Sequence, residues 1–115
     1  MNITRSIRKI VTKNELKTII SNNSALIIDV RNSDEVKNEG KINSKSFVNL
    51  PLDKIDEARK TIPLDQNIVV YCTAGKRSAQ AKMKLDSFGY KNVVNYAGGY
   101  MDWISHIVNK FESKM

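Results

Sequence analysis

The sequence predicts an α/β fold in which helices cover both faces of a central, mostly parallel sheet. Two apolar runs rich in β-branched residues, 25–30 and 68–71, have the length and composition of strands buried on both faces. Helical patterning follows each of them, and such alternation is typical of parallel sheets. The 115 residues contain no repeat or linker-like segment, so we expect one domain over residues 1–115, with its core at about 9–111.

The first part of the chain contains two helix starts around a buried strand. Thr12–Glu15 has the sequence of a capping box, in which the threonine and glutamate oxygens accept hydrogen bonds from free amides. It predicts a helix over about residues 13–22, before the strand over 25–30. Asn32–Glu35 is a second capping sequence, and it predicts a short helix that ends near Gly40.

The middle of the chain predicts a short strand and a helical stretch. Phe47 and Val48 indicate the strand, and Pro51 marks the turn into a helix-like sequence over residues 52–59. This stretch is expected to end before Pro63, because the residue that precedes a proline is disfavoured in helical conformation.

The last part of the chain continues the alternation. The clearest strand, 68–71, ends at Cys72, and a helix with a glycine stop is predicted over 78–88. A strand over 93–96 and a last helix from Met101 to about Phe111 complete the predicted elements.

The charge balance is strongly basic. Lys and Arg number 19 against 12 Asp and Glu, for a formal net charge of +7, and such an excess attracts anions. We expect small anionic substrates and no nucleic acid, because the lysines are dispersed and not interleaved with aromatic residues in a stripe. A solvated surface is the simpler explanation for most of these lysines.

The sequence predicts a cytoplasmic protein without a membrane partner. No apolar run approaches the roughly 20 residues of a membrane helix, and the N-terminus lacks the apolar stretch and cleavage site of a secretory signal. The basic residues before Glu15 are also compatible with an organelle transit peptide, although they run directly into sequence with folded patterning.

Cysteine and histidine each occur once, as Cys72 and His106. The chain cannot form an internal disulfide bond and lacks the ligand set of a structural zinc site, so we expect neither a metal nor another cofactor. We interpret His106 as an ordinary polar residue of the predicted last helix, which disfavours a Cys–His catalytic pair.

The strongest candidate for chemistry is Cys72, because ligands of open parallel sheets bind at the carboxyl ends of strands. The next residues lead directly into a helix, so backbone amides and the helix dipole can converge on the sulfur. Such surroundings lower a cysteine pKa from about 8.5 toward ~3.5–7.5. The expected site has Cys72 as nucleophile and a binding loop of Thr73, Ala74, Gly75, Lys76, Arg77 and Ser78.

A lone cysteine is more often a small buried hydrophobe than a reactive group. Here Cys72 closes an apolar strand, Gly75 lets the loop turn, and the cations Lys76 and Arg77 precede a helix. This combination favours a reactive thiolate over a structural cysteine.

Several segments resemble the motifs of one family. Cys72-x-x-Gly75-x-Arg77-Ser78 is similar to the active-site loop of the single-domain rhodaneses, which are thiosulfate-type sulfurtransferases. The resemblance runs in the family's order from about residue 9 to residue 107, and it implies the rhodanese fold. The other matching segments are Leu26–Arg31 with Glu35 and Gly40–Ile42, then Asn49–Pro51, and finally Gly98–Trp103.

By this resemblance, Cys72 takes a sulfane sulfur from thiosulfate or a related persulfide donor and passes it to cyanide, a thiol or another thiophilic acceptor. The acceptor must be external, with a protein thiol as one candidate, because the chain has no second cysteine. Lys76 and Arg77 are expected to favour dianionic donors. The alternative functions are a persulfide carrier, or a rhodanese-like interaction module, without efficient turnover.

Asp29, Arg31 and Glu35 form a charged set near the predicted site. We interpret them as structural support, in which these side chains pair with one another or with the backbone to hold strand and loop together. Tyr100 and Trp103 are interpreted as packing residues.

Three departures from the family pattern affect the inference. Lys41 stands where the family commonly has histidine, and the stretch from Asn43 to Val48 lacks the family's usual Gly-Ala pair, but both lie in a non-catalytic segment. Thr73 replaces a frequent arginine, which bears on the preference for thiosulfate. The main enzymatic alternative is a phosphatase or arsenate reductase of the same fold, whose loop has one more residue between cysteine and arginine. By resemblance, the shorter loop over residues 73–76 suits a single sulfur atom, so we predict no phosphatase activity.

Overall fold

The sheet is wholly parallel, and its strands lie in the order β2-β1-β3-β4. The computed structural model describes residues 10–105. The predicted α/β class is confirmed, while the ends of the predicted core, 9–111, and His106 lie outside the described residues. The strands are β1 (Leu26–Asp29), β2 (Phe47–Asn49), β3 (Ile68–Tyr71) and β4 (Val93–Asn95).

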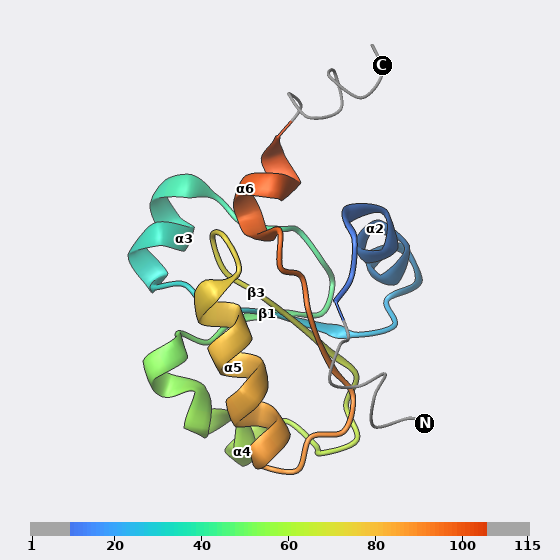
Figure 1. Ribbon diagram of the computed structural model, residues 1–115, viewed down its shortest axis with the longest axis vertical. Helices are drawn as coiled ribbons and strands as arrows, with labels where there is room; N and C mark the ends of the chain where they lie inside the picture. The colour runs from blue at the N-terminus through green and yellow to red at the C-terminus, as the bar shows by residue number, and fades with distance from the viewer. Residues whose placement is uncertain (1–9, 106–115) are drawn as a thin grey trace.

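Helical segments connect the strands and cover both faces of the sheet. In Figure 1, α4 and α5 lie on one side of β1 and β3, and α2 lies on the other. Within residues 10–105, no helix has the length and hydropathy needed to cross a bilayer. The helical elements are α2 (Lys13–Asn22), α3 (Ser33–Glu39), the 3-10 helix η1 (Leu52–Glu57), α4 (Ala58–Thr61), α5 (Lys76–Ser87) and α6 (Gly99–Ile104).

Alternation along the strands divides the apolar residues between two cores. Ile28 and Val70 are fully buried on the side of η1, α4 and α5. Their neighbours Ile27 and Val69 are equally buried on the side of α2 and α6. Because successive residues of a strand point to opposite faces, two covered faces require continuous apolar runs, and this is the pattern in the sequence.

The start of α2 has the capping box that its sequence predicts. The Glu15 amide donates to Thr12 Oγ1 at 3.1 Å, and the Thr12 amide donates to Glu15 Oε1 at 2.8 Å. Both amides would otherwise lack a partner at the helix start.

The helical stretch after Pro51 differs in type from the prediction. Residues 52–57 form a 3-10 helix, and only residues 58–61 are α-helical. Leu52, Ile55 and Ala58 recur every third residue, a spacing that a 3-10 helix aligns on one face. All three pack against the core next to α5, so burial selects the tighter helix.

The last helix is shorter than predicted. α6 begins at Gly99 and ends at Ile104, because Ser105 has extended backbone with φ −79° and ψ 133°. Lys13, at the start of α2, lies against the end of α6. Its Nζ donates to the carbonyl oxygens of Asp102 and Ser105, at 3.1 and 3.2 Å. The predicted helix through residue 111 is therefore wrong at Ser105, and its remaining part lies outside the described residues.

Candidate active site

The carboxyl ends of β1 and β3 meet at one edge of the sheet, where Asp29 lies opposite Tyr71. Cys72 follows β3 directly, and a short loop leads from it into α5, which begins at Lys76, two residues earlier than predicted. The Cys72 residue is only 2% exposed. The loop thus places a buried sulfur beside the N-terminus of α5.

Three hydrogen bonds converge on the Cys72 sulfur. The Gly75 and Ser78 amides donate to Sγ at 3.1 and 3.4 Å, and Ser78 Oγ lies 3.4 Å from Sγ. Burial raises the pKa of the thiol, but hydrogen bonds from the Ser78 hydroxyl and from the amides of Ser78, Gly75 and Ala74 outweigh it. The pKa of Cys72 is therefore lower than that of an ordinary cysteine, which favours the thiolate.

The start of α6 holds the loop from outside. The Tyr100 amide donates to the Cys72 carbonyl oxygen at 2.8 Å, and the Met101 amide donates to that of Thr73 at 3.1 Å. Gly99 permits this approach, since it has φ +70° and a Cβ there would collide with both carbonyl oxygens. Sequence reasoning missed this role, and the signal available for it was the glycine pair that precedes Tyr100.

Arg77 does not stand free at the loop. Its Nη1 and Nη2 donate to the two carboxylate oxygens of Glu35, at 2.6 and 2.9 Å, and Nη2 also donates to Thr73 Oγ1 at 3.1 Å. The bidentate bond from Arg77 lowers the pKa of Glu35 to about 2, and the same bond raises the pKa of Arg77. Lys76 is exposed at the start of α5.

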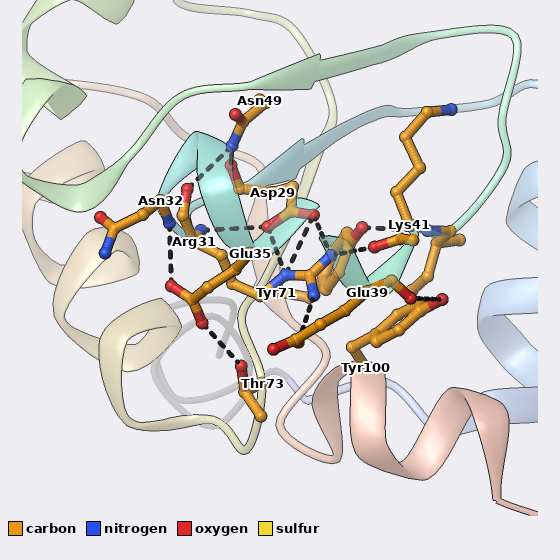
Figure 2. A network of polar contacts seen from close by, with 12 residues as sticks. Asp29, Arg31, Asn32, Glu35, Glu39, Lys41, Asn49, Tyr71, Thr73 and Tyr100 are labelled. Carbon is orange, nitrogen blue, oxygen red and sulfur yellow. Dashed lines mark hydrogen bonds and ion pairs between the residues drawn. The ribbon is translucent and has the colours of Figure 1, made fainter. Parts of the chain in front are cut away.

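Glu35 therefore has a different ionic partner from the expected one. As predicted, its carboxylate accepts a backbone hydrogen bond, from the Asn32 amide at 3.1 Å. Figure 2 shows the side chain directed from α3 toward Thr73 and the loop, away from Arg31. Its ionic partner is Arg77 and not Arg31, because the fold brings the start of α5 within its reach.

Asp29 and Arg31 form a fully buried ion pair behind the site (Figure 2). Arg31 donates to Asp29 Oδ2 at 2.8 Å and to the Gly40 carbonyl oxygen at 2.7 Å. Its guanidinium lies 4.5 Å from the ring centroid of Tyr100 and 5.7 Å from that of Tyr71. Burial lowers the pKa of Arg31, but Asp29 raises it more, so the group stays charged and ties strand β1 to the end of α3.

Two further polar residues lie beside this pair. Asn49 Nδ2 donates to the carbonyl oxygens of Asp29 and Arg31, both at 2.9 Å, and joins β2 to the turn after β1. Lys41 points away from the network, toward Asn43 Oδ1 at 3.2 Å and the ring of Phe47 at 4.7 Å. Lys41 is thus a surface residue of the segment after α3.

Trp103 packs edge-on against Tyr96, with ring centroids 6.3 Å apart. Tyr100 does more than pack, because its hydroxyl donates to the Glu39 carbonyl oxygen at 3.1 Å and its ring covers Arg31. Within residues 10–105, no three His, Cys, Asp or Glu side chains gather as a metal ion would require.

A buried cysteine of lowered pKa, held between a parallel strand and a helix start by backbone donors, is the kind of site that a thiolate-containing α/β domain has. The sequence matches the model of the Rhodanese-like domain family over residues 12–106. The chain belongs to this family.

Similar proteins are named as sulfurtransferases. The chain is 32% identical over 113 residues to the thiosulfate sulfurtransferase/rhodanese-like domain-containing protein 3 of Mus musculus, covering 87% of this chain and 71% of that protein. It is 39% identical over 77 residues to the thiosulfate sulfurtransferase PspE of Escherichia coli, covering 65% and 70%. The structure of the human single-domain sulfurtransferase TSTD1 has a TM-score of 0.74 at 28% identity, covering 84% and 95%.

Proposed function

We propose that this protein is a sulfurtransferase in which Cys72 carries the transferred sulfur as a persulfide. The observation that carries the proposal is the pair of hydrogen bonds that the Cys72 sulfur accepts from the Gly75 and Ser78 amides at the start of α5. Relatives named as thiosulfate sulfurtransferases support the same reaction class.

The reaction has two steps. The Cys72 thiolate attacks the terminal sulfur of thiosulfate, a sulfur–sulfur bond forms at Sγ, and sulfite leaves with the electron pair of the broken bond. An external nucleophile such as cyanide or a thiolate then takes the terminal sulfur and returns the Cys72 thiolate. The amides of Ala74, Gly75 and Ser78 stabilise negative charge on sulfur in both states.

Burial of Cys72 restricts what can react with it. With 2% of the residue exposed, the sulfur admits a terminal sulfur atom at the end of a small group more readily than a bulky electrophile. Arg77 is engaged by Glu35 and is not free to clamp a phosphate in the way a phosphatase requires. We therefore expect no hydrolysis of aryl phosphates.

Intact-protein mass spectrometry tests the proposal. The protein is incubated with thiosulfate and then with cyanide, and Cys72→Ser serves as the variant without the thiol. We expect a gain of one sulfur atom that cyanide removes and that the variant lacks. No gain with thiosulfate or with alternative persulfide donors would refute sulfur transfer and favour an interaction module.

Turnover distinguishes an enzyme from a carrier. An enzyme produces thiocyanate from thiosulfate and cyanide in many cycles with ping-pong kinetics. A carrier loads one sulfur per chain but releases it slowly to small acceptors. Fast loading of one sulfur per chain, followed by slow thiocyanate formation, would therefore identify the carrier.

A further inference from the structure

One carboxylate from a different helix binds both ends of the Cys72 loop. Glu35 lies in the first turn of α3 and accepts hydrogen bonds from Arg77 at 2.6 and 2.9 Å. Thr73 Oγ1, at the other end of the loop, lies 3.4 Å from Glu35 and 3.1 Å from Arg77 Nη2. The three side chains thus form one cluster at the Cys72 loop.

Within this cluster, the Glu35 carboxylate compensates the positive charge of Arg77. Both partners are ionised at neutral pH, and their side chains are only 25% and 33% exposed, so water screens the pair incompletely. The interaction between the charge at Cys72 and Arg77 contributes to the raised pKa of that guanidinium, so the cation and the sulfur are electrostatically coupled. Thr73 adds a hydroxyl and no charge.

We propose that Glu35 is a specificity-determining residue, which neutralises Arg77 and thereby reduces the preference of the site for doubly charged sulfur donors over singly charged ones. Glu35 acts through Arg77 and does not touch the sulfur. The inference rests on the proposed sulfurtransferase function and names a charge class of donor for the same site.

Two donors that differ by one charge make the proposal measurable. Thiosulfate is a dianion and methanethiosulfonate is a monoanion. In both cases the Cys72 thiolate attacks the terminal sulfur, the donor's sulfur–sulfur bond breaks, and sulfite or methanesulfinate leaves with the electron pair. The rate constant for persulfide formation, measured by quenching and mass spectrometry at subsaturating donor, is independent of any acceptor.

Glu35→Gln removes the charge and keeps an acceptor for Arg77. Because the energy of a donor in a given field is proportional to its charge, the factor for the dianion should be the square of that for the monoanion. We expect about a fourfold faster reaction with thiosulfate and about a twofold faster one with methanethiosulfonate, so the thiosulfate/methanethiosulfonate ratio rises about twofold.

Arg77→Gln provides the opposite change, since it leaves the carboxylate uncompensated. The ratio should then fall about twofold, and the double variant Glu35→Gln/Arg77→Gln should return it close to the original value. Asp34→Asn is the matched control: it removes the same charge from the neighbouring, exposed position of α3 and should change the ratio little, because exposed charges are screened.

The donor ratio separates charge from structure, because a loosened loop slows both donors alike. An unchanged ratio in Glu35→Gln and Arg77→Gln, with persulfide still formed, would overturn the proposal and leave Glu35 as a support of the loop. If Glu35→Gln does not fold, Arg77→Gln and the double variant decide by the same ratio. Failure of the unaltered protein to form any persulfide with either donor would instead refute the sulfurtransferase function and the inference with it.

Discussion

The hydroxyl of Ser78 should account for a measurable part of the acidity of Cys72. In the thiol state the hydroxyl can donate to the Gly75 carbonyl oxygen, at 3.2 Å, while it accepts from the thiol. In the thiolate state its single hydrogen must turn to Sγ, at 3.4 Å, and the Gly75 oxygen loses that donor. Ser78→Ala removes the hydroxyl and keeps the backbone amide that also donates to Sγ.

The expected shift follows from these two hydrogen bonds. A hydrogen bond to a charged group contributes about 1.5–3 kcal/mol, and the neutral bond given up at Gly75 about 1 kcal/mol. The net preference for the thiolate is then about 1.4 kcal/mol, which corresponds to a pKa that is higher by about one unit in Ser78→Ala. At a pH below both pKa values, the variant should hold about tenfold less thiolate.

The assay is the pH dependence of alkylation by iodoacetamide. The chain contains one cysteine, so the rate reports on Cys72 alone. Ser87→Ala is the matched control, because Ser87 lies on the exposed side of the same helix and donates to the Lys84 carbonyl oxygen. A pKa in Ser78→Ala that is unchanged, or lower than in Ser87→Ala, would refute this account of the sulfur environment.

Three predictions concern stability, each measured as the free energy of unfolding in urea. The pKa of Glu35, about 2 against an ordinary 4.5, means that its ion pair stabilises the fold above pH 4.5 and that this contribution is lost as the pH falls toward 2. The full shift corresponds to about 3 kcal/mol, of which we expect about half because the pair is partly exposed. Glu35→Gln should flatten this pH dependence, and an equally steep fall would contradict it. Gly99→Ala should lower the free energy of unfolding by about 2–4 kcal/mol, because its φ is positive and the added Cβ collides with the loop carbonyls. A loss below about 1 kcal/mol would show that α6 can move aside. Asp29→Asn should lower the free energy of unfolding by about 3 kcal/mol, because it leaves the buried Arg31 without its carboxylate. Glu39 is the second, half-exposed partner of Arg31, at 3.4 Å, and Glu39→Gln should lower it by less than about 1 kcal/mol. Equal losses at both positions would disprove the assignment of burial as the cause.

Local patterns were sufficient for the element order and for the position of the cysteine. Each of these features depends on residues only a few positions apart in the sequence: the capping box at Thr12, the buried runs of β1 and β3, and the loop after Cys72. Parallel strands then bring their carboxyl ends to one edge, so the place of the candidate site follows from the order alone. The 3-10 helix at residues 52–57 is an exception, because packing of its apolar residues on the sheet selected it.

Contacts between distant segments had to come from the fold. Glu35 and Arg77 are 42 positions apart, and the sequence indicates neither their pairing nor its effect on the loop. The support of Cys72 by the Tyr100 amide depends on how closely α6 approaches the loop, which the glycine at 99 permits.

The amino-acid order alone therefore specified the α/β class, the family and the position of the candidate cysteine, because periodicity, caps and a loop motif are short-range features. The three-dimensional arrangement specified which charges near the sulfur are compensated. Charge compensation depends on distance and burial, and neither is contained in the spacing of residues along the chain.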